Sequence, residues 1–201
     1  MLNAIIEYFT GKDLMPIWEQ FANEKHGKLK STSGDLFVEY LHSNFKIQIG
    51  EFTHYVTSGG QTYESKYLIG ILDFTNPDNF ELSISPEDLL AKLGKLLKNE
   101  DIKIGNKNFD SKFLVKSNHE FKAVTVLRDK SLMEKIILAN PTLLEITRNK
   151  GLFDEHRPPE GKFMLYFAKQ EKFKEINQLN SIHLLLLTFI EKLKENFQIQ
   201  N

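Results

Sequence analysis

The densest group of reactive side chains lies in residues 154–162, which read DEHRPPEGK. Asp154, Glu155 and Glu160 supply carboxylates, and His156 supplies an imidazole. A histidine beside a carboxylate is a common acid–base pair, so the segment is a candidate site for a hydrolase or another acid–base enzyme. We favour the alternative of a mobile, solvated hairpin loop stiffened by its proline pair. Charged connections of this kind are common, and the spacing matches no established chemistry.

A second group of oxygen-bearing side chains resembles the start of a calcium loop. Asn106, Asn108 and Asp110 are spaced two residues apart, like the first ligands of such a loop. Ser111 stands where the sharp turn requires glycine, and Ser117 stands where the closing bidentate glutamate belongs. We therefore reject a metal site here. The segment is predicted to be a structural turn in which Asp110 hydrogen-bonds to nearby backbone.

The remaining sequence carries no assembled catalytic motif. The six histidines form neither an HExxH motif nor a pair four residues apart, and His183 lies in the apolar stripe of a predicted helix. We expect His183 to be a core histidine with one satisfied nitrogen. No nucleophile elbow, phosphate loop or dinucleotide fingerprint occurs, so no cofactor is predicted.

Composition excludes several further classes of protein. The chain has 201 residues, 41% of them hydrophobic and 26% charged, and a formal net charge of −1. This balance is ordinary for a globular protein and provides no field for attracting nucleic acid. Cysteine is absent, which removes disulfides and thiolate sites.

The N-terminal residues do not fit a signal peptide, because Glu7 interrupts the apolar run and no basic residue precedes it. The longest apolar run, residues 182–190, has about half the length needed to span a bilayer. We therefore predict a cytoplasmic protein without a membrane span.

Hydrophobic periodicity predicts an order of helices, strands, helices, strands and one long helix. Strands are expected at residues 36–41, 45–52, 66–74, 80–84, 113–115, 142–148, 151–155 and 162–168, with a bulge or bend at Gly50-Glu51. Helices are expected from about residue 13, after Ser85, after Asn118, after a capping box of Ser131 and Glu134, and from about 171 to 197.

No strand–helix–strand alternation is present, so the prediction is an α+β fold with a curved antiparallel sheet, flanking helices and a long C-terminal helix. No linker interrupts residues 1–201, which indicates a single domain. The halves at about 14–98 and 119–197 each place strands before a helix, which suggests a duplicated unit. Too few residues match between the halves to establish a repeat.

Residues 101–117, DIKIGNKNFDSKFLVKS, resemble a segment of an uncharacterised bacterial protein family of unknown function. The shared pattern is Gly-x-x-x-Phe-Asp-x-x-Phe-x-Val-x-Ser, carried here by Gly105, Phe109, Asp110, Phe113, Val115 and Ser117. A helix with Trp18 ahead of a strand-rich region is also similar, so the likeness extends over about residues 14–128. Members of the family often carry membrane helices, which are not found in this sequence. The resemblance implies a fold-level unit and no particular activity.

Together these features favour a non-enzymatic binding or interaction module. A sheet packed on a long helix can enclose an apolar small molecule. A helix that is apolar on nearly all sides can pack against a protein partner. The sequence leaves the oligomeric state open between a monomer and a weak homodimer. An acid–base enzyme that uses the charged loop is the alternative.

Overall fold

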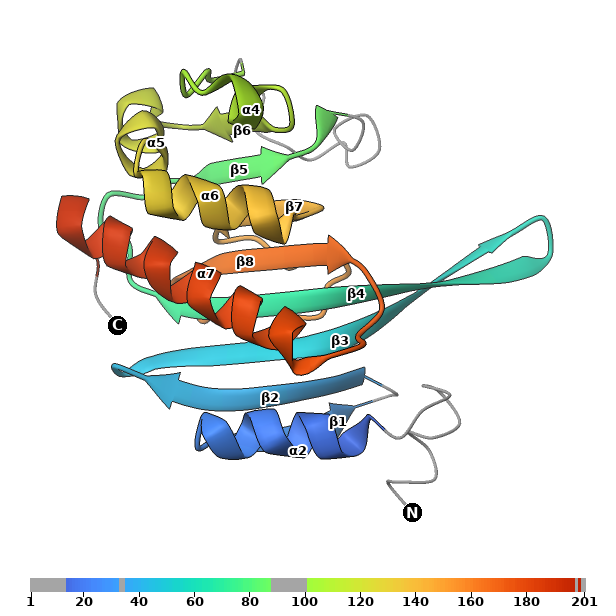
Figure 1. The fold of residues 1–201 in the computed structure, drawn as a ribbon. Helices are drawn as coiled ribbons and strands as arrows, with labels where there is room; N and C mark the ends of the chain where they lie inside the picture. The colour runs from blue at the N-terminus through green and yellow to red at the C-terminus, as the bar shows by residue number, and fades with distance from the viewer. Residues whose placement is uncertain (1–13, 33–34, 88–100, 198, 200–201) are drawn as a thin grey trace.

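A computed structural model describes residues 14–32, 35–87, 101–197 and 199. The chain forms one open, antiparallel sheet of eight strands in the order β1-β2-β3-β4-β8-β7-β5-β6 (Figure 1). The predicted α+β class with an antiparallel sheet is confirmed. The strands are β1 (Lys28–Thr32), β2 (Asp35–His42), β3 (Phe45–Ser58), β4 (Gln61–Phe74), β5 (Leu82–Ser85), β6 (Leu114–Ser117), β7 (Leu143–Thr147) and β8 (Phe163–Gln170).

The helices gather on one face of this sheet (Figure 1). They are α2 (Met15–Glu24), the single turn α4 (Lys107–Asp110), α5 (Glu120–Leu127), α6 (Lys130–Ala139) and α7 (Ile176–Asn196). Within the described residues, none of them is long and apolar enough to cross a bilayer. The helix predicted after Ser85 falls largely on residues 88–100, which lie outside the described part of the chain.

Helix α7 organises the main core, as its periodicity predicts. Leu179, Leu186 and Leu193 are buried against the sheet. The packing is close: a Cβ added to Gly70 of β4 would lie 2.5 Å from Ile182 Cγ2. Small residues at such positions let a helix approach the sheet backbone.

The apolar flank of α7 is covered within the chain. Leu185 and Phe189 are fully buried, whereas Leu184 is 52% exposed. Helix α6 packs alongside α7 (Figure 1), where Lys192 of α7 pairs with Asp129 at the α6 N-terminus at 3.1 Å. The helix of residues 130–139 therefore provides the cover.

His183 is a core histidine, as predicted. Its side chain is buried, and its Nδ1 lies 2.7 Å from the Tyr40 hydroxyl. Burial, together with the nearby charges of Lys25 and His42, lowers the His183 pKa to about 4. The imidazole is therefore neutral at pH 7.

The predicted bulge at Gly50-Glu51 is absent, because both residues keep the regular register between β2 and β4. Glu51 occupies the inward position, where it accepts a hydrogen bond from the Phe173 amide at 2.6 Å and pairs with Lys66 at 3.3 Å. Gly50 serves close packing, since a Cβ there would lie 2.4 Å from the Cβ of Phe37. An inward polar residue, and not an extra residue, breaks the apolar alternation.

Other local predictions also need correction. Strand β1 was not predicted, because its residues KLKST are mostly exposed and lack an apolar alternation. The N-cap of α5 is His119, one residue after the predicted Asn118, and the N-cap of α6 is Asp129, two residues before the predicted Ser131. Residues 151–155 form turns and no strand.

Candidate interaction surface on the β arm and its supporting loop

The charged loop of residues 154–162 is part of the β7–β8 connection, residues 148–162, which lies on the sheet face opposite the helices. That face has its own small apolar cluster, which includes Ile71, Met164 and Tyr166, and Leu152 from the loop packs against it. The loop is therefore packed on the sheet, in contrast to the solvated hairpin favoured from its composition. Three sets of contacts hold it there.

The first set centres on Glu155. Its carboxylate accepts a hydrogen bond from the Tyr166 hydroxyl and another from the Phe153 amide. The Leu152 amide in turn donates to the Tyr166 hydroxyl at 3.2 Å. Burial and the neighbouring Glu155 charge raise the pKa of Tyr166 well above its ordinary value, so the phenol keeps its proton. A Cβ at Gly151 would collide with the Glu155 carboxylate, at 2.3 Å from Oε1.

The second set is a histidine–carboxylate pair that the sequence did not reveal. His156 Nε2 lies 3.0 Å from Asp73 Oδ1, with only 18% and 12% of the two side chains exposed. The acids suggested from the sequence lie elsewhere. Asp154 pairs with Lys150 at 2.7 Å, Glu155 engages Tyr166, and Glu160 is exposed. Asp73 is 83 residues from His156 in the sequence, so only the β4–β8 pairing reveals the contact.

A carboxyl group with an altered pKa lies on the other side of Tyr166 in the sheet. Glu145 of β7 stands opposite Tyr166 of β8, and its carboxyl accepts a hydrogen bond from Ser83 at 3.2 Å. Burial, with a smaller contribution from the Glu81 charge, raises the Glu145 pKa to about 7. The carboxyl therefore exchanges its proton near neutral pH.

The third set joins the loop to the β3–β4 hairpin. The Phe153 ring stacks on His54 with centroids 4.2 Å apart and on Phe52 at 5.3 Å. It also contacts Tyr67 at 4.6 Å. Phe52, His54 and Tyr67 lie where the hairpin leaves the body of the sheet, so the loop braces the hairpin at its base.

Beyond this base the hairpin projects from the molecule as an arm (Figure 1). We define the arm as residues 53–66. Strand β2 pairs with β3 only as far as Glu51, and β8 pairs with β4 only from Tyr67, so within the described residues the arm strands pair only with each other. Gly59 and Gly60 form its two-residue turn with φ of +59° and +78°. The glycine pair in TSGGQTYES, residues 57–65, predicts a hairpin loop, but the strands continue to the tip, with β3 ending at Ser58 and β4 beginning at Gln61.

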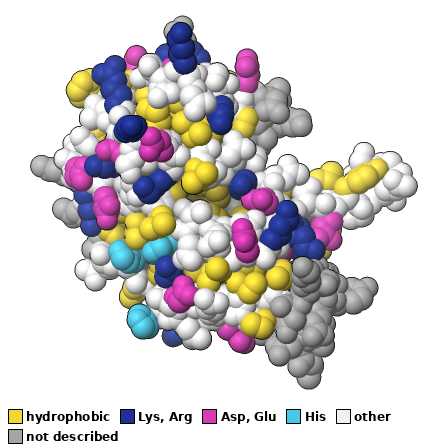
Figure 2. All heavy atoms as spheres, viewed as in Figure 1, with side chains coloured by type: hydrophobic (Ala, Val, Ile, Leu, Met, Phe, Trp, Pro, Cys, Tyr) yellow, Lys and Arg dark blue, Asp and Glu magenta, His cyan; other side chains and the backbone are white. Residues whose placement is uncertain are grey.

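The arm exposes apolar side chains. Tyr55 is 52%, Val56 47% and Tyr63 55% exposed. Val56 and Tyr63 are cross-strand partners, and so are Phe52 and Tyr67 at the base. Because side chains alternate between faces, both pairs lie on the face that Phe153 contacts. Figure 2 shows hydrophobic side chains on the projecting arm and charged side chains near its base.

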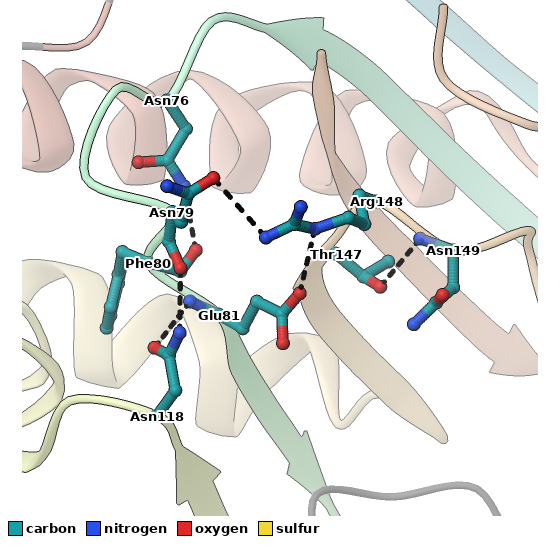
Figure 3. A network of polar contacts seen from close by, with 8 residues as sticks. All are labelled: Asn76, Asn79, Phe80, Glu81, Asn118, Thr147, Arg148 and Asn149. Atoms are coloured by element: carbon teal, nitrogen blue, oxygen red, sulfur yellow. Dashed lines mark hydrogen bonds and ion pairs between the residues drawn. The ribbon is translucent and has the colours of Figure 1, made fainter. Parts of the chain in front are cut away.

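A different polar network stabilises the turn between β4 and β5 (Figure 3). Arg148 donates to Asn79 at 3.3 Å and to Glu81 at 3.4 Å, and its guanidinium lies 5.0 Å from the centre of the Phe163 ring. Asn118 accepts a hydrogen bond from the Glu81 amide and donates to the Asn79 carbonyl. These bonds join the turn to the ends of β6 and β7, which is a structural role.

The calcium-like segment is a structural turn, as predicted. Asn106 accepts hydrogen bonds from the amides of Asn108 and Phe109, and Asp110 accepts from those of Ile104 and Gly105. Both side chains are thus committed to the backbone. No group of three or more metal-binding side chains occurs within the described residues.

Comparisons with protein-family models, with curated protein sequences and with solved structures each find no match to this chain. The likeness of residues 101–117 to a bacterial family therefore stays a prediction from the sequence.

Proposed function

We propose that this chain is a non-enzymatic interaction module that binds a protein partner through its β arm. The observation that carries the proposal is a projecting hairpin whose two edges pair with no other described strand and on which Tyr55, Val56 and Tyr63 are exposed. Folded proteins usually protect open strand edges with charged side chains, short strands or proline. Residues 55–63 contain neither a charged side chain nor proline.

The open edges offer backbone groups as well as side chains. Ser58 and Gln61 flank the two-residue turn, so they form a hydrogen-bonded pair, and such pairs alternate along an antiparallel ladder. The N–H and C=O groups of Tyr55 and Thr57 then point toward the open edge of β3. The Thr53 amide, which has the same orientation, donates to Asp35 at 2.9 Å. A strand from a partner can use these groups by β-augmentation.

An apolar small molecule has less support as the ligand. The natural place for it is the space between α7 and the sheet, but side chains fill this space next to Gly70. A Cβ on that glycine would lie 2.5 Å from Ile182 and 3.1 Å from Leu186. A protein partner on the arm requires no such cavity.

The acid–base enzyme remains the second candidate, and the His156–Asp73 pair is the observation that favours it. A carboxylate can orient an imidazole for proton transfer. Against this reading, Glu155 uses both carboxylate oxygens to hold the loop, and Asp154 pairs with Lys150. The cluster is better explained as the anchor of the loop that braces the arm.

Native mass spectrometry of the protein purified from its source cells tests the proposal. The wild type should retain a bound protein, and Tyr63→Lys should lose it, because a charge at this cross-strand position opposes an apolar contact. Leu138→Lys is the matched control, since Leu138 of α6 is 79% exposed and lies outside the arm. Retention of the same partner by Tyr63→Lys would contradict the proposal.

A further inference from the structure

Resting on that proposed function, we infer that a partner of the arm is a second copy of this chain. The two β3 edges pair antiparallel about a two-fold axis at Val56, which joins two arms into one four-stranded ribbon. The reasons are the direction of the backbone groups, the absence of charge on the facing strands and the projection of the arm.

The backbone of the β3 edge is complementary to itself. Tyr55 and Thr57 direct their N–H and C=O groups outward, as the alternation with the Ser58–Gln61 pair requires. In a register centred on Val56, Tyr55 of one copy stands opposite Thr57 of the other, and Thr57 stands opposite Tyr55. Each of these two equivalent pairs can exchange two backbone hydrogen bonds. A closed two-fold contact requires such an isologous arrangement.

The side chains on this edge also suit self-pairing. Residues 53–58 carry no formally charged side chain, and the chain has a net charge of only −1, so two copies approach without strong repulsion. At the axis, the two Val56 side chains meet at a non-hydrogen-bonded position, where cross-strand side chains are closest. Tyr63 flanks Val56 on each arm, so the ribbon gains a continuous apolar centre.

The β4 edge of the arm fits a second copy less well. It includes Glu64, whose side chain is 44% exposed, and Lys66, which pairs with Glu51 at 3.3 Å and with Glu64 at 3.5 Å. Two-fold pairing centred on Glu64 places like charges opposite each other, which is unfavourable. Pairing centred on Ser65 sets Glu64 against Lys66, but these two side chains already form ion pairs within the chain. The β3 edge is therefore the self-complementary one, and the arm projects from the body of the molecule (Figure 1).

The absence of cysteine allows a direct test of the register. In Val56→Cys the two sulfhydryl groups would face each other across the axis, where Cα atoms of a non-hydrogen-bonded pair are about 4.5 Å apart. This separation lies within the range that a disulfide spans. Mild oxidation should therefore give a covalent dimer on a non-reducing gel.

Tyr63→Cys is the matched control, because Tyr63 has similar exposure (55% against 47% for Val56) but lies one strand away from the axis. We expect Val56→Cys to cross-link at least tenfold faster than Tyr63→Cys at the same concentration. Equal rates, or no cross-linking of Val56→Cys, would overturn the inference.

Sedimentation equilibrium of the unmodified chain supplies the second measurement. An arm-to-arm contact is small, so a weak dimer is expected, with a dissociation constant on the order of 10–500 μM. Val56→Lys should weaken the dimer at least tenfold, whereas Leu138→Lys should not. A wild type that stays monomeric to about 1 mM overturns the inference. In that case the proposed function still stands if native mass spectrometry shows that Tyr63→Lys releases a different protein. The proposed function is itself contradicted if Tyr63→Lys retains every partner of the wild type.

Discussion

Replacing Glu145 with glutamine should make the protein more stable above pH 7 and leave it unchanged near pH 4. Glu145 is a partly buried side chain of β7 with a pKa of about 7. Glutamine has nearly the same shape and can still accept the hydrogen bond from Ser83. Glu145→Gln therefore removes the charge with little change in packing.

The raised pKa of Glu145 determines whether the free energy of unfolding rises or falls with pH. The folded state holds the Glu145 proton up to a pKa of about 7, whereas the unfolded chain releases it near the ordinary value of 4.5. Between these values the folded state binds more protons, so this residue makes the free energy of unfolding fall as pH rises from 4.5 to 7. The difference between 4.5 and about 7, at 1.36 kcal/mol per pH unit, corresponds to about 3 kcal/mol. Residual contact with water reduces this figure, so we expect a gain of about 1–3 kcal/mol for Glu145→Gln at pH 8.

His183 acts in the opposite direction over the same pH range. Its pKa is lowered from 6.5 to about 4, so the unfolded chain binds more protons there and this residue lowers stability as the pH falls below 6.5. The two contributions partly cancel in the wild type. The free energy of unfolding of the wild type can therefore change little with pH even though both residues contribute to it. In Glu145→Gln the contribution of His183 remains and should make stability fall as the pH drops below 6.5.

Urea unfolding of wild type and variant at pH 4, 6 and 8 measures the effect as a difference, in which all other titrating groups cancel. Ser83→Ala is a useful companion, because it removes the hydrogen bond to Glu145 and keeps the charge. A stability difference between Glu145→Gln and wild type that is the same at all three pH values would refute the raised pKa.

Three further predictions test the packing. Leu186→Ala should lower the free energy of unfolding by about 2–5 kcal/mol at any protein concentration, because Leu186 is fully buried within the chain; a concentration-dependent loss would indicate an interface instead. His156→Ala should lower it by about 1–2 kcal/mol in denaturant titrations, because it leaves Asp73 without its partner, and no change would indicate a mobile loop. Calorimetric titration with calcium should show no micromolar binding, since Asp110 is occupied by two backbone amides; a site lost in Asp110→Ala would contradict this.

Much of the fold could be predicted from local pattern. The alternation of Phe45, Ile47 and Ile49 places β3 correctly, and the spacing of Leu179, Leu186 and Leu193 identifies the buried face of α7. Both predictions succeed because each element buries one face, so its apolar residues recur at regular spacing in the sequence. Strand β1 and the arm leave no such trace, because their side chains are mostly exposed.

The candidate surface depends on contacts between distant segments, so the sequence could not reveal it. Asp73 contacts the charged loop, and Glu145 stands opposite Tyr166, only because β8 inserts between β4 and β7. The arm edges become open only because β2 and β8 stop pairing at Glu51 and Tyr67. Chain composition specifies neither the strand order nor where pairing stops.

The position of β8 also constrains how this protein can be synthesised. Strand β8 lies between β4 and β7, yet it follows all the other strands in the sequence. Until residues 163–170 leave the ribosome, β1–β4 and β5–β7 cannot join, and β4 and β7 both present unpaired edges. Ile71 and Leu72 on β4 and Leu143 and Leu144 on β7 are then uncovered, at an edge where other nascent chains can pair. Closure of the sheet is therefore a late step that links strands of large sequence separation, and a ribosome stalled before residue 163 should leave an aggregation-prone chain.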